Sequence, residues 1–432
     1  MTTTSSAPRP HALLITLAIA LLAAGIAFAQ GATNQADPDA WPQFRGPQQT
    51  GKVDGAALAS SWPADGPSVN WRVPLGSGFS SISAVDGRLF TLFGERGSSH
   101  VGAFDASTGK RLWTHRLGKE RRDQFGDGPR ATPTVHDGVV YAVGELGALV
   151  ALDAATGKVR WQHDLADRFD ARIPTWGISS SPLVVDDLLL HNVGGKRGYL
   201  IVAFNLADGK VAWHTGSGKP GYATPLDVTL GGVRQAVFFA GEEIISVKPD
   251  DGTVLWQRPW RTSYDVNAAM PIFLAPDKIF ISSGYDVGAI VLQVAKRSDG
   301  SLAVETAWKG RGMKNQYSSS VLHDGTIYGF DDSILKAIDP ATGDTRWRAR
   351  GFGHGSLIYA DGHLIVLGDR GKLALVEASP TGYVEKASTD MLSGKHWTAP
   401  TLYDGQLLIR NEKELISLKV STSGGESSRA GR

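Results

Sequence analysis

The sequence predicts an all-β protein, an eight-bladed β-propeller of four-stranded antiparallel blades, and three observations carry that prediction. Near copies of one short segment recur at 103–113, 151–161 and 337–347, with looser relatives between them. The tryptophans that end the copies lie 39 to 52 residues apart, and a period of roughly 40–50 residues is typical of a propeller blade. Beyond the amino-terminal region, no segment has a long apolar stripe of helical period.

The amino terminus has the features of a cleavable signal peptide. Arg9 and His11 precede an apolar run, and Ala27-Phe28-Ala29 has the small-x-small form of a cleavage site. The run is short and poorly flanked for a membrane anchor. We therefore expect residues 1–29 to be removed after Ala29, and the mature protein to be periplasmic or secreted with no stable membrane anchor.

Residues 30–68 are predicted to form a linker and an extended clasp. They contain WPQFRGPQQTG at 41–51, and this proline and glycine content favours an extended segment laid over the main body. We expect Arg45 to form a salt bridge with that body. An opening motif of this kind is similar to one found in many exported proteins built from the same repeat.

Each repeat unit has the signals of a four-stranded meander. A small or polar residue and a proline lead into an apolar strand and an Asp-Gly turn, as at 131–138 and 398–405. Asp-Gly between apolar runs is typical of a tight hairpin, because both central residues of that turn need a positive φ. A third strand, a Thr-Gly-Lys turn and a fourth strand with the tryptophan complete the unit.

Eight first strands can be counted, but the last unit has only three strands before the polar carboxyl terminus. The segment at 69–75 has fourth-strand character and no unit before it. We infer that it completes the eighth blade and closes the ring, which leaves no open sheet edge. The propeller is expected over 69–420, followed by a disordered tail at 421–432. The eight first strands are expected at 80–86, 131–137, 179–186, 223–230, 268–276, 318–324, 355–361 and 398–404.

The charge of the chain gives no reason to expect nucleic acid as a partner. Forty-four basic and forty-three acidic residues leave a formal net charge of +1, so no basic field is present. The run at 119–123 is mixed in sign, and we interpret it as a solvated loop. We expect a monomer whose partner is an envelope protein, a small ligand or a saccharide.

The repeat resembles a known motif at its most regular copies, AFDASTGKRLW, ALDAATGKVRW and AIDPATGDTRW. It is similar to the tryptophan-docking motif of the pyrroloquinoline-quinone (PQQ) type propeller repeats, shared by quinoprotein alcohol dehydrogenases and the BamB family of exported propellers. The resemblance implies that each tryptophan packs between neighbouring blades, with its indole N–H reaching a carbonyl. The matching residues are Trp113, Trp161, Trp213, Trp256, Trp308 and Trp347.

The enzymes of that family need certain side chains to hold their cofactor, and some of these side chains are absent from this chain. Quinoprotein dehydrogenases hold the quinone beneath a ring of two adjacent cysteines beside a metal ion, and this chain has no cysteine. The acidic pairs at 186–187, 250–251 and 331–332 lie in expected turns, where aspartate caps the backbone. We expect no cofactor and no catalytic residue, and PQQ with calcium stays open as an alternative.

Candidate ligand-binding residues lie just before the innermost strands. In a propeller these positions converge on one mouth of the central channel, and bulky polar or aromatic side chains are frequent there. Such a concave site is the usual form of a ligand pocket, although the same residues would also serve as a packed plug. Phe79 belongs to this ring, and Arg130 beside Asp127 is expected to bind a carboxylate or quinone oxygen. The candidates are Asp127, Arg130, Trp176, Tyr222, Asn267, Asn315, Gln316, Tyr317, His354, His396 and Trp397.

Three functions follow from these features. The regular blades and the incomplete catalytic signatures favour a noncatalytic propeller that binds a protein or ligand in the cell envelope. A PQQ-dependent alcohol or sugar dehydrogenase is the alternative, and a saccharide-binding propeller is the second alternative.

Overall fold

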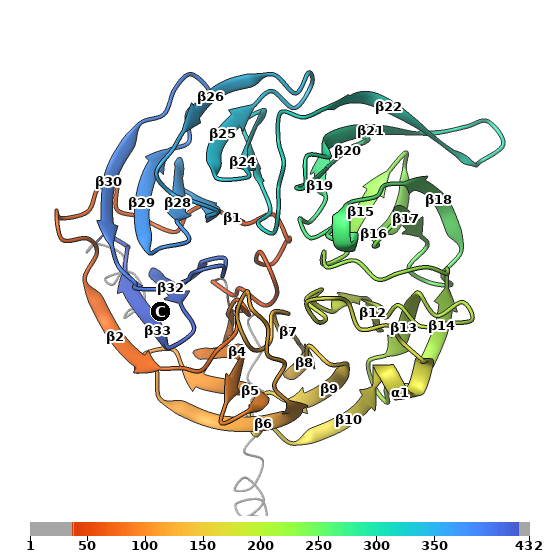
Figure 1. Ribbon diagram of the computed structural model, residues 1–432, viewed down its shortest axis with the longest axis horizontal. Coiled ribbons are helices and arrows are strands. Elements are labelled where there is room, and N and C mark those ends of the chain that lie inside the picture. Colours follow the sequence, from red (N-terminus) through yellow and green to blue (C-terminus); the bar gives the residue numbers. More distant parts are fainter. Residues whose placement is uncertain (1–36, 38, 423–432) are drawn as a thin grey trace, which may run out of the picture. The chain divides into compact units, whose positions relative to one another are not determined.

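The computed structural model describes Asp37 and residues 39–422, and the described residues from 39 onward belong to one structural unit. Eight sheets are arranged around a central axis in this unit (Figure 1). The predicted eight-bladed all-β propeller is therefore confirmed. The expected signal peptide at 1–29 and residues 423–432 of the expected tail lie outside the described residues. Within the described part of the chain, no helix is long and apolar enough to span a bilayer.

Each blade contains four strands, and consecutive strands in a blade pair antiparallel. We number the blades in chain order. Blade one consists of β3 (Ser83–Val85), β4 (Arg88–Glu95), β5 (Ser98–Asp105) and β6 (Arg111–Lys119), and blade two of β7 (Thr134–His136), β8 (Val139–Val143), β9 (Ala148–Asp153) and β10 (Val159–Asp164). Blade three consists of β11 (Leu183–Val185), β12 (Leu188–Asn192), β13 (Ile201–Asn205) and β14 (Val211–Thr215). Blade four consists of β15 (Leu226–Leu230), β16 (Val233–Phe239), β17 (Glu243–Val247) and β18 (Val254–Pro259).

Blades five to eight follow the same order. Blade five consists of β19 (Ile272–Leu274), β20 (Lys278–Ser283), β21 (Gly288–Lys296) and β22 (Leu302–Gly310), and blade six of β23 (Val321–His323), β24 (Thr326–Asp331), β25 (Ile334–Ile338) and β26 (Thr345–Ala349). Blade seven consists of β27 (Ser356–Ala360), β28 (His363–Leu367), β29 (Lys372–Glu377) and β30 (Glu385–Asp390). Blade eight consists of β31 (Thr401–Tyr403), β32 (Gln406–Arg410), β33 (Glu414–Lys419) and β2 (Val69–Pro74). The helical segments described are α1 (Leu165–Phe169) and η1 (Ser263–Asp265).

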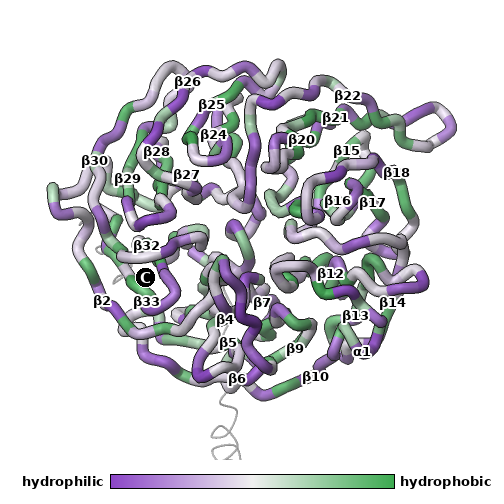
Figure 2. The backbone as a smooth tube through the Cα atoms, in the orientation of Figure 1, coloured by the Kyte–Doolittle hydropathy of each residue, from purple (hydrophilic) through white to green (hydrophobic). Residues whose placement is uncertain are grey.

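The local rules of the sequence account for the hairpins. At the turn between β7 and β8, Asp137 and Gly138 have φ values of 46° and 71°, the left-handed conformation that a two-residue hairpin requires. The two middle strands of the blades are almost entirely buried. Figure 2 shows the resulting pattern, with hydrophobic stretches along the strands inside the blades and hydrophilic stretches concentrated in the loops.

The ring is closed by the early strand, as predicted. β2 pairs antiparallel with β33, with Trp71 opposite Ser417. The indole of Trp71 then donates to the Ala106 carbonyl of blade one at 3.0 Å. The amino-terminal strand therefore completes blade eight and also binds the blade that follows it.

The docking tryptophans join neighbouring blades in the predicted manner. Trp113 of blade one donates to the Ala154 carbonyl of blade two at 3.0 Å. Its ring covers Gly157 in the Thr-Gly turn, where φ is 70° and an added Cβ would lie 2.7 Å from the indole. The motif needs glycine there because the indole occupies the space of a side chain. Trp256 differs, since its indole donates to the Gln235 side chain of its own blade at 2.6 Å.

Residues 41–58, here called the channel segment, run through the centre of the ring (Figure 1). Trp41 pairs with Ala84 of blade one. The Gln49 side chain donates to a backbone carbonyl of blade four at 3.1 Å, and β1 (Lys52–Val53) pairs in parallel with β27 of blade seven. Contacts with blades on opposite sides of the ring require a path across the axis. The expected clasp is thus an internal element.

Arg45 holds the channel segment in place through backbone carbonyls. Its side chain is buried, and its guanidinium donates to the carbonyls of Ser319 at 3.1 Å and Ser320 at 2.5 Å in blade six. The expected salt bridge is replaced by these bonds, since no carboxylate among the described residues is in ion-pair contact with Arg45. Burial lowers its pKa to about 10, so the group stays charged at neutral pH.

The described end of the expected tail is bound by the channel segment. Ser421 forms a bridge with Leu58, and the Thr422 amide donates to the Ala57 carbonyl at 2.9 Å. The chain is thus ordered for two residues past the expected end of the propeller at 420.

Candidate functional site

A cavity of about 860 Å³ opens at one end of the central channel. We call it the mouth cavity. The loops that connect consecutive blades form its rim, and Phe44 and Arg45 of the channel segment lie among its lining residues. Because the channel segment crosses the axis below the rim, it gives the cavity a floor.

The lower wall of the mouth cavity consists of hydroxyl side chains at the starts of the inner strands. Each accepts a hydrogen bond from a backbone N–H of the preceding blade: Ser81 N–H to Thr132 at 3.1 Å, Thr132 N–H to Ser181 at 2.9 Å, and Ser181 N–H to Thr224 at 3.0 Å. These bonds link blades one to four near the axis. They explain why a small hydroxyl residue precedes the proline in the repeat.

One side of the mouth cavity carries a packed group of aromatic rings. The ring centroids of Trp397 and Phe79 are 5.3 Å apart, and those of Trp397 and Tyr317 are 5.0 Å apart. The Tyr317 hydroxyl donates to the carbonyl of His354, and burial raises the pKa of Tyr317 well above its usual value. These bonds and contacts fix the rings before any ligand arrives.

The other side carries a second group of rings that extends to the surface. Trp176 contacts Phe125 edge-on at 6.1 Å and Tyr264 edge-on at 5.6 Å, and Tyr264 contacts Tyr285 at 6.1 Å. Tyr264 is 64% exposed and Phe125 is 42% exposed. Tyr222 lies below Trp176 and is buried, which raises its pKa to about 12.

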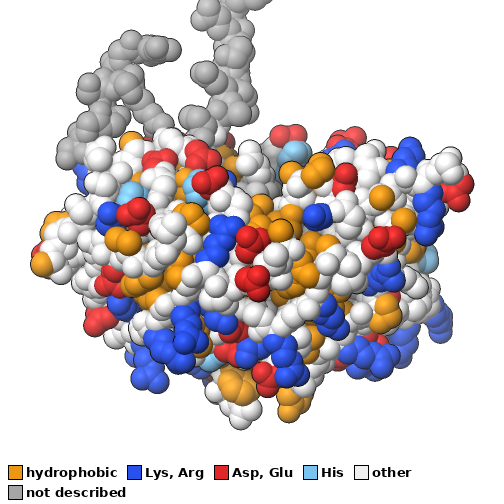
Figure 3. Space-filling model, turned by 90° about the horizontal axis from the view of Figure 1, so that it is seen from above, with side chains coloured by type: hydrophobic (Ala, Val, Ile, Leu, Met, Phe, Trp, Pro, Cys, Tyr) orange, Lys and Arg blue, Asp and Glu red, His pale blue; other side chains and the backbone are white. Residues whose placement is uncertain are grey.

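The charged groups that line the mouth cavity are mostly arginines. Arg130 donates to the carbonyls of Gly126 at 3.0 Å and Gly128 at 3.2 Å, and its guanidinium lies 5.4 Å from the centre of the Phe79 ring. Burial lowers the pKa of Arg130. The one carboxylate in the lining is that of Asp123, which lies 3.7 Å from Arg121. Figure 3 views the ring from one side, with lysine and arginine side chains most numerous along its lower edge.

Six of the eleven candidate residues line the mouth cavity. They are Arg130, Trp176, Tyr222, Gln316, Tyr317 and Trp397.

The other five candidates support the loops instead of facing the cavity. Asp127 accepts a hydrogen bond from the backbone N–H of residue 123 at 2.9 Å and forms no ion pair with Arg130. Asn267 is fully buried and donates to the backbone carbonyls of Ala240 and Gly241, in the turn between β16 and β17. His354 supplies the carbonyl for Tyr317. Two more are buried side chains, Asn315 and His396.

Several lining residues were missed from the sequence. Tyr285 lies between the second and third strands of blade five, and the prediction considered only the residues before inner strands. Tyr264 lies eight residues before β19 begins at Ile272, in η1, too far ahead of the strand to be selected. The interpretation of 119–123 as a solvated loop is wrong for Asp123, whose side chain is 5% exposed.

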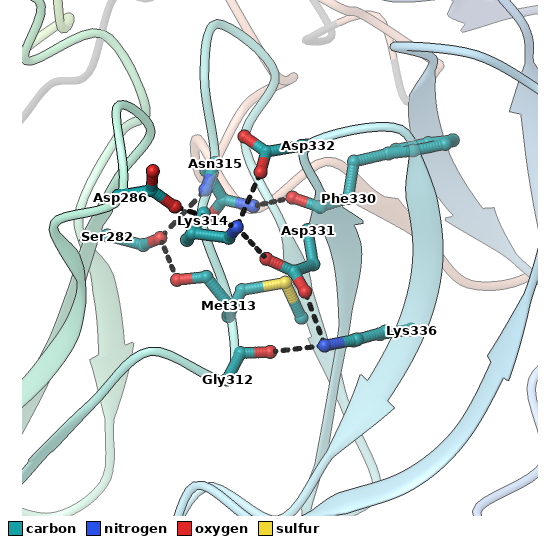
Figure 4. Close-up of polar contacts among 10 residues, drawn as sticks. All are labelled: Ser282, Asp286, Gly312, Met313, Lys314, Asn315, Phe330, Asp331, Asp332 and Lys336. Atoms are coloured by element: carbon teal, nitrogen blue, oxygen red, sulfur yellow. Dashed lines mark hydrogen bonds and ion pairs between the residues drawn. The ribbon is translucent and has the colours of Figure 1, made fainter.

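The acidic pair Asp331-Asp332 binds lysines in the structure (Figure 4). The Lys314 ammonium lies 2.6 Å from Asp332, 3.8 Å from Asp331 and 3.3 Å from Asp286, and the Asp332 carboxylate raises its pKa. Lys336 also pairs with Asp331. The ammonium of Lys314 thus occupies the position where these carboxylates would bind a cation. The cluster fixes the loop that carries Gln316 and Tyr317.

The lining of the mouth cavity fits an anion better than a metal ion. Calcium takes six to eight oxygen ligands, several of them carboxylates, and here a single carboxylate lies close to an arginine. Among the described residues, no three acidic or histidine side chains are grouped to hold a metal. A planar polycarboxylate such as PQQ matches the rings and arginines, but calcium beside it does not fit.

Comparison with protein families shows what the propeller is related to. A family model described as outer membrane protein assembly factor BamB matches residues 97–347 and 331–426. The matched residues cover well over half of the chain.

Relatives of two kinds are similar in sequence. The chain is 31% identical over 156 residues to quinoprotein alcohol dehydrogenase PedH of Pseudomonas putida, a match covering 34% of this chain and 25% of that protein. It is 25% identical over 344 residues to outer membrane protein assembly factor BamB of Burkholderia pseudomallei, covering 74% of this chain and 80% of that protein. The chain therefore spans about a quarter of the dehydrogenase and most of the assembly factor.

Solved structures of both kinds share the fold. BamB from Moraxella catarrhalis matches with a TM-score of 0.56 at 14% identity, covering 80% of this chain and 99% of that chain. Quinohemoprotein alcohol dehydrogenase from Comamonas testosteroni matches with a TM-score of 0.60 at 14% identity, covering 90% and 82%. At this identity the likeness concerns architecture alone.

Proposed function

Since the chain belongs to the outer membrane protein assembly factor BamB family of PQQ-like repeat propellers, we propose that it is a noncatalytic propeller that binds a ligand or protein segment in the cell envelope. The observation that carries the proposal is the mouth cavity, which has a floor, two groups of aromatic rings and three arginines besides Arg45. Concave sites with apolar walls and a few polar groups are the usual form of binding sites.

The envelope location rests on two supports. The amino-terminal sequence has the pattern of an exported chain, with its expected cleavage after Ala29. The family model and the relative from Burkholderia pseudomallei are both described as outer membrane protein assembly factors. A periplasmic propeller that contacts another envelope protein agrees with both.

Binding at the mouth predicts position-specific crosslinking. A photoreactive amino acid at Phe125, on the rim, should give crosslinked products in cells that export the protein. The same amino acid at Val384 should not, because that residue is equally exposed, at 42%, but lies in the turn between β29 and β30, away from the loops of the mouth. Filling the cavity by Gln316→Trp should remove the products at Phe125. Equal products at both positions would contradict the proposal.

The second candidate is a quinone-dependent dehydrogenase, favoured by the arginines and rings that suit a planar polycarboxylate. We expect PQQ at saturating concentration to raise the melting temperature to the same extent with and without calcium, because Asp123 is the one carboxylate among the described residues that line the cavity. We expect no dye-linked oxidation of alcohols or sugars. A calcium-dependent rise, together with dye reduction that Arg130→Gln abolishes, would establish the dehydrogenase instead.

A further inference from the structure

We propose that the mouth cavity binds the acidic end of an oligosaccharide, a chain whose terminal sugar carries a carboxylate, and that the exposed rim tyrosine holds the sugars that follow. This inference rests on the proposed binding function and names its ligand class. Three independent features of the cavity support it: its charge, its floor and its strained rim.

The charged residues that line the cavity favour an anionic ligand. Arg45, Arg121, Arg122 and Arg130 line it together with one carboxylate, that of Asp123. Arg45 is occupied by backbone carbonyls. Arg130 has no carboxylate in ion-pair contact among the described residues, although it is largely removed from water, and two carbonyls hold its guanidinium in one orientation. A ligand carboxylate would supply the missing charge at small entropic cost, because the guanidinium is already positioned.

The floor of the cavity favours a chain end. The channel segment contacts blade one, then blade four across the ring, then blade seven, and Phe44 and Arg45 form part of the lining. A polymer cannot pass through the ring while this segment is in place. It can enter only with its terminus, and the terminus meets the arginines.

The rim contains two tyrosines in a strained backbone conformation. Tyr264 has a φ of 59° and Tyr285 a φ of 56°, the left-handed region that costs a residue with a Cβ about 1–2 kcal/mol. Tyr285 takes this conformation in the turn between β20 and β21, where the Val287 N–H donates to the Gly284 carbonyl at 3.2 Å. Tyr264 takes it in η1, outside any hairpin, and strain of that kind clusters at ligand clamps. The two rings meet edge to face with their centroids 6.1 Å apart, and Tyr264 stays 64% exposed.

Sugar rings suit this surface better than an extended peptide. The two groups of rings offer flat apolar faces to the C–H surface of a pyranose, and the Gln316 amide and the hydroxyls of Ser179 and Ser319 also line the cavity, where they can bind sugar hydroxyls. Among the described residues that line the cavity, only Ser356 and Leu357 belong to a strand, β27, and β1 already pairs with the free side of that strand, so the cavity walls are loops that give an extended peptide no strand to extend.

Calorimetry with matched tetrasaccharides tests the charge. The probes are tetragalacturonic acid and the neutral tetrasaccharide of the same linkage in which each carboxylate is reduced to an alcohol. The acidic probe should bind at least about tenfold more tightly, and Arg130→Gln should remove most of that difference. The control is Arg311→Gln, because Arg311 is an exposed arginine in an inter-blade loop that does not line the cavity. It should leave both affinities unchanged.

The strained tyrosine provides a second test that does not depend on charge. Tyr264→Gly relieves the left-handed backbone, so the melting temperature should hold or rise while the affinity for the acidic probe falls about tenfold. Tyr264→Phe keeps the ring and should keep the affinity. A fall in melting temperature with Tyr264→Gly and unchanged affinity would overturn the role of the rim.

The remaining outcomes separate this inference from the proposed function. Equal binding of the acidic and neutral probes would overturn the acidic class and leave the mouth as a binding site. Equal binding of an acidic tetrapeptide, Glu-Glu-Glu-Glu, would overturn the saccharide class. Failure of every probe, with crosslinking from Phe125 intact, would overturn the ligand class and leave the proposed function standing.

Discussion

Replacing Arg410 by alanine should lower the free energy of unfolding by about 3–5 kcal/mol. Arg410 ends β32 in blade eight, and its side chain is fully buried. Its guanidinium donates to the carbonyls of Leu92 at 2.6 Å, Gly76 at 3.0 Å and Ser77 at 3.2 Å. These acceptors lie in blade one and in the loop that leads to it. The arginine therefore binds the seam that β2 closes.

The size of the effect follows from the groups that the arginine leaves behind. Burial lowers the pKa of Arg410 to about 9, so removing the charge recovers some desolvation energy. The Ser77 carbonyl keeps its hydrogen bond from the Gly94 N–H at 2.9 Å. The other carbonyls lose the donors that the guanidinium supplied, at about 1–3 kcal/mol each, and alanine leaves a cavity. Arg410→Lys should give an intermediate loss, because an ammonium has three donors but cannot reach all the acceptors.

Urea unfolding measures the change. The matched control is Arg348→Ala, because Arg348 is an exposed arginine on the outer strand β26, and its loss should stay within about 0.5 kcal/mol. A loss below about 1 kcal/mol for Arg410→Ala would mean that water or relaxed loops replace the guanidinium, and it would remove Arg410 from the closure of the ring.

The fold was predictable because each of its parts follows a local rule. The Asp-Gly turns indicated the hairpins, and the period of the tryptophans indicated the number of blades. The segment at 69–75 had no blade of its own, and the last blade lacked a fourth strand. The route of the channel segment was not predictable. Arg45 bonds to carbonyls some 274 residues away, and no periodic pattern in 41–51 indicates which side of the ring it contacts. Its proline and glycine content indicated extension and nothing about burial.

Trp256 shows where the repeat rule fails. The following unit has no Thr-Gly-Lys turn, since β21 and β22 extend into a longer hairpin. The indole therefore has no carbonyl from such a turn, and it donates to Gln235 in its own blade.

The sequence predicted the region of the candidate site but not all of the residues that line it. Residues before inner strands do converge at the mouth, but their directions depend on irregular loops. Asn267 and Asn315 turn inward because buried carbonyls need donors there, whereas Tyr264 turns outward in a left-handed conformation that no sequence pattern indicates.

Acid should destabilise the propeller through two buried histidines, His191 and His396. His191 is fully buried in β12, and His396 is 1% exposed before β31. Nε2 of His191 and both ring nitrogens of His396 have no hydrogen-bond partner. Burial lowers the pKa of each to about 4 from the usual 6.5.

The sign of the effect follows from which state binds protons first. As the pH falls below about 6.5, these histidines take up protons in the unfolded chain, whereas the folded protein excludes the protons until about pH 4. Stability is therefore complete above about pH 6.5 and is lost between about pH 6.5 and 4, at about 3 kcal/mol for each histidine. The two together should remove about 6 kcal/mol.

The measurement compares the free energy of unfolding at pH 7 and pH 4 in each variant, so that packing losses common to both pH values cancel. His191→Phe should reduce the acid-induced loss by about 3 kcal/mol. The control is His136→Gln, because His136 lies at the surface with a side chain 42% exposed, and it should leave the loss unchanged. An unaltered pH dependence in His191→Phe would show that water reaches the buried imidazole and that acid acts on other groups.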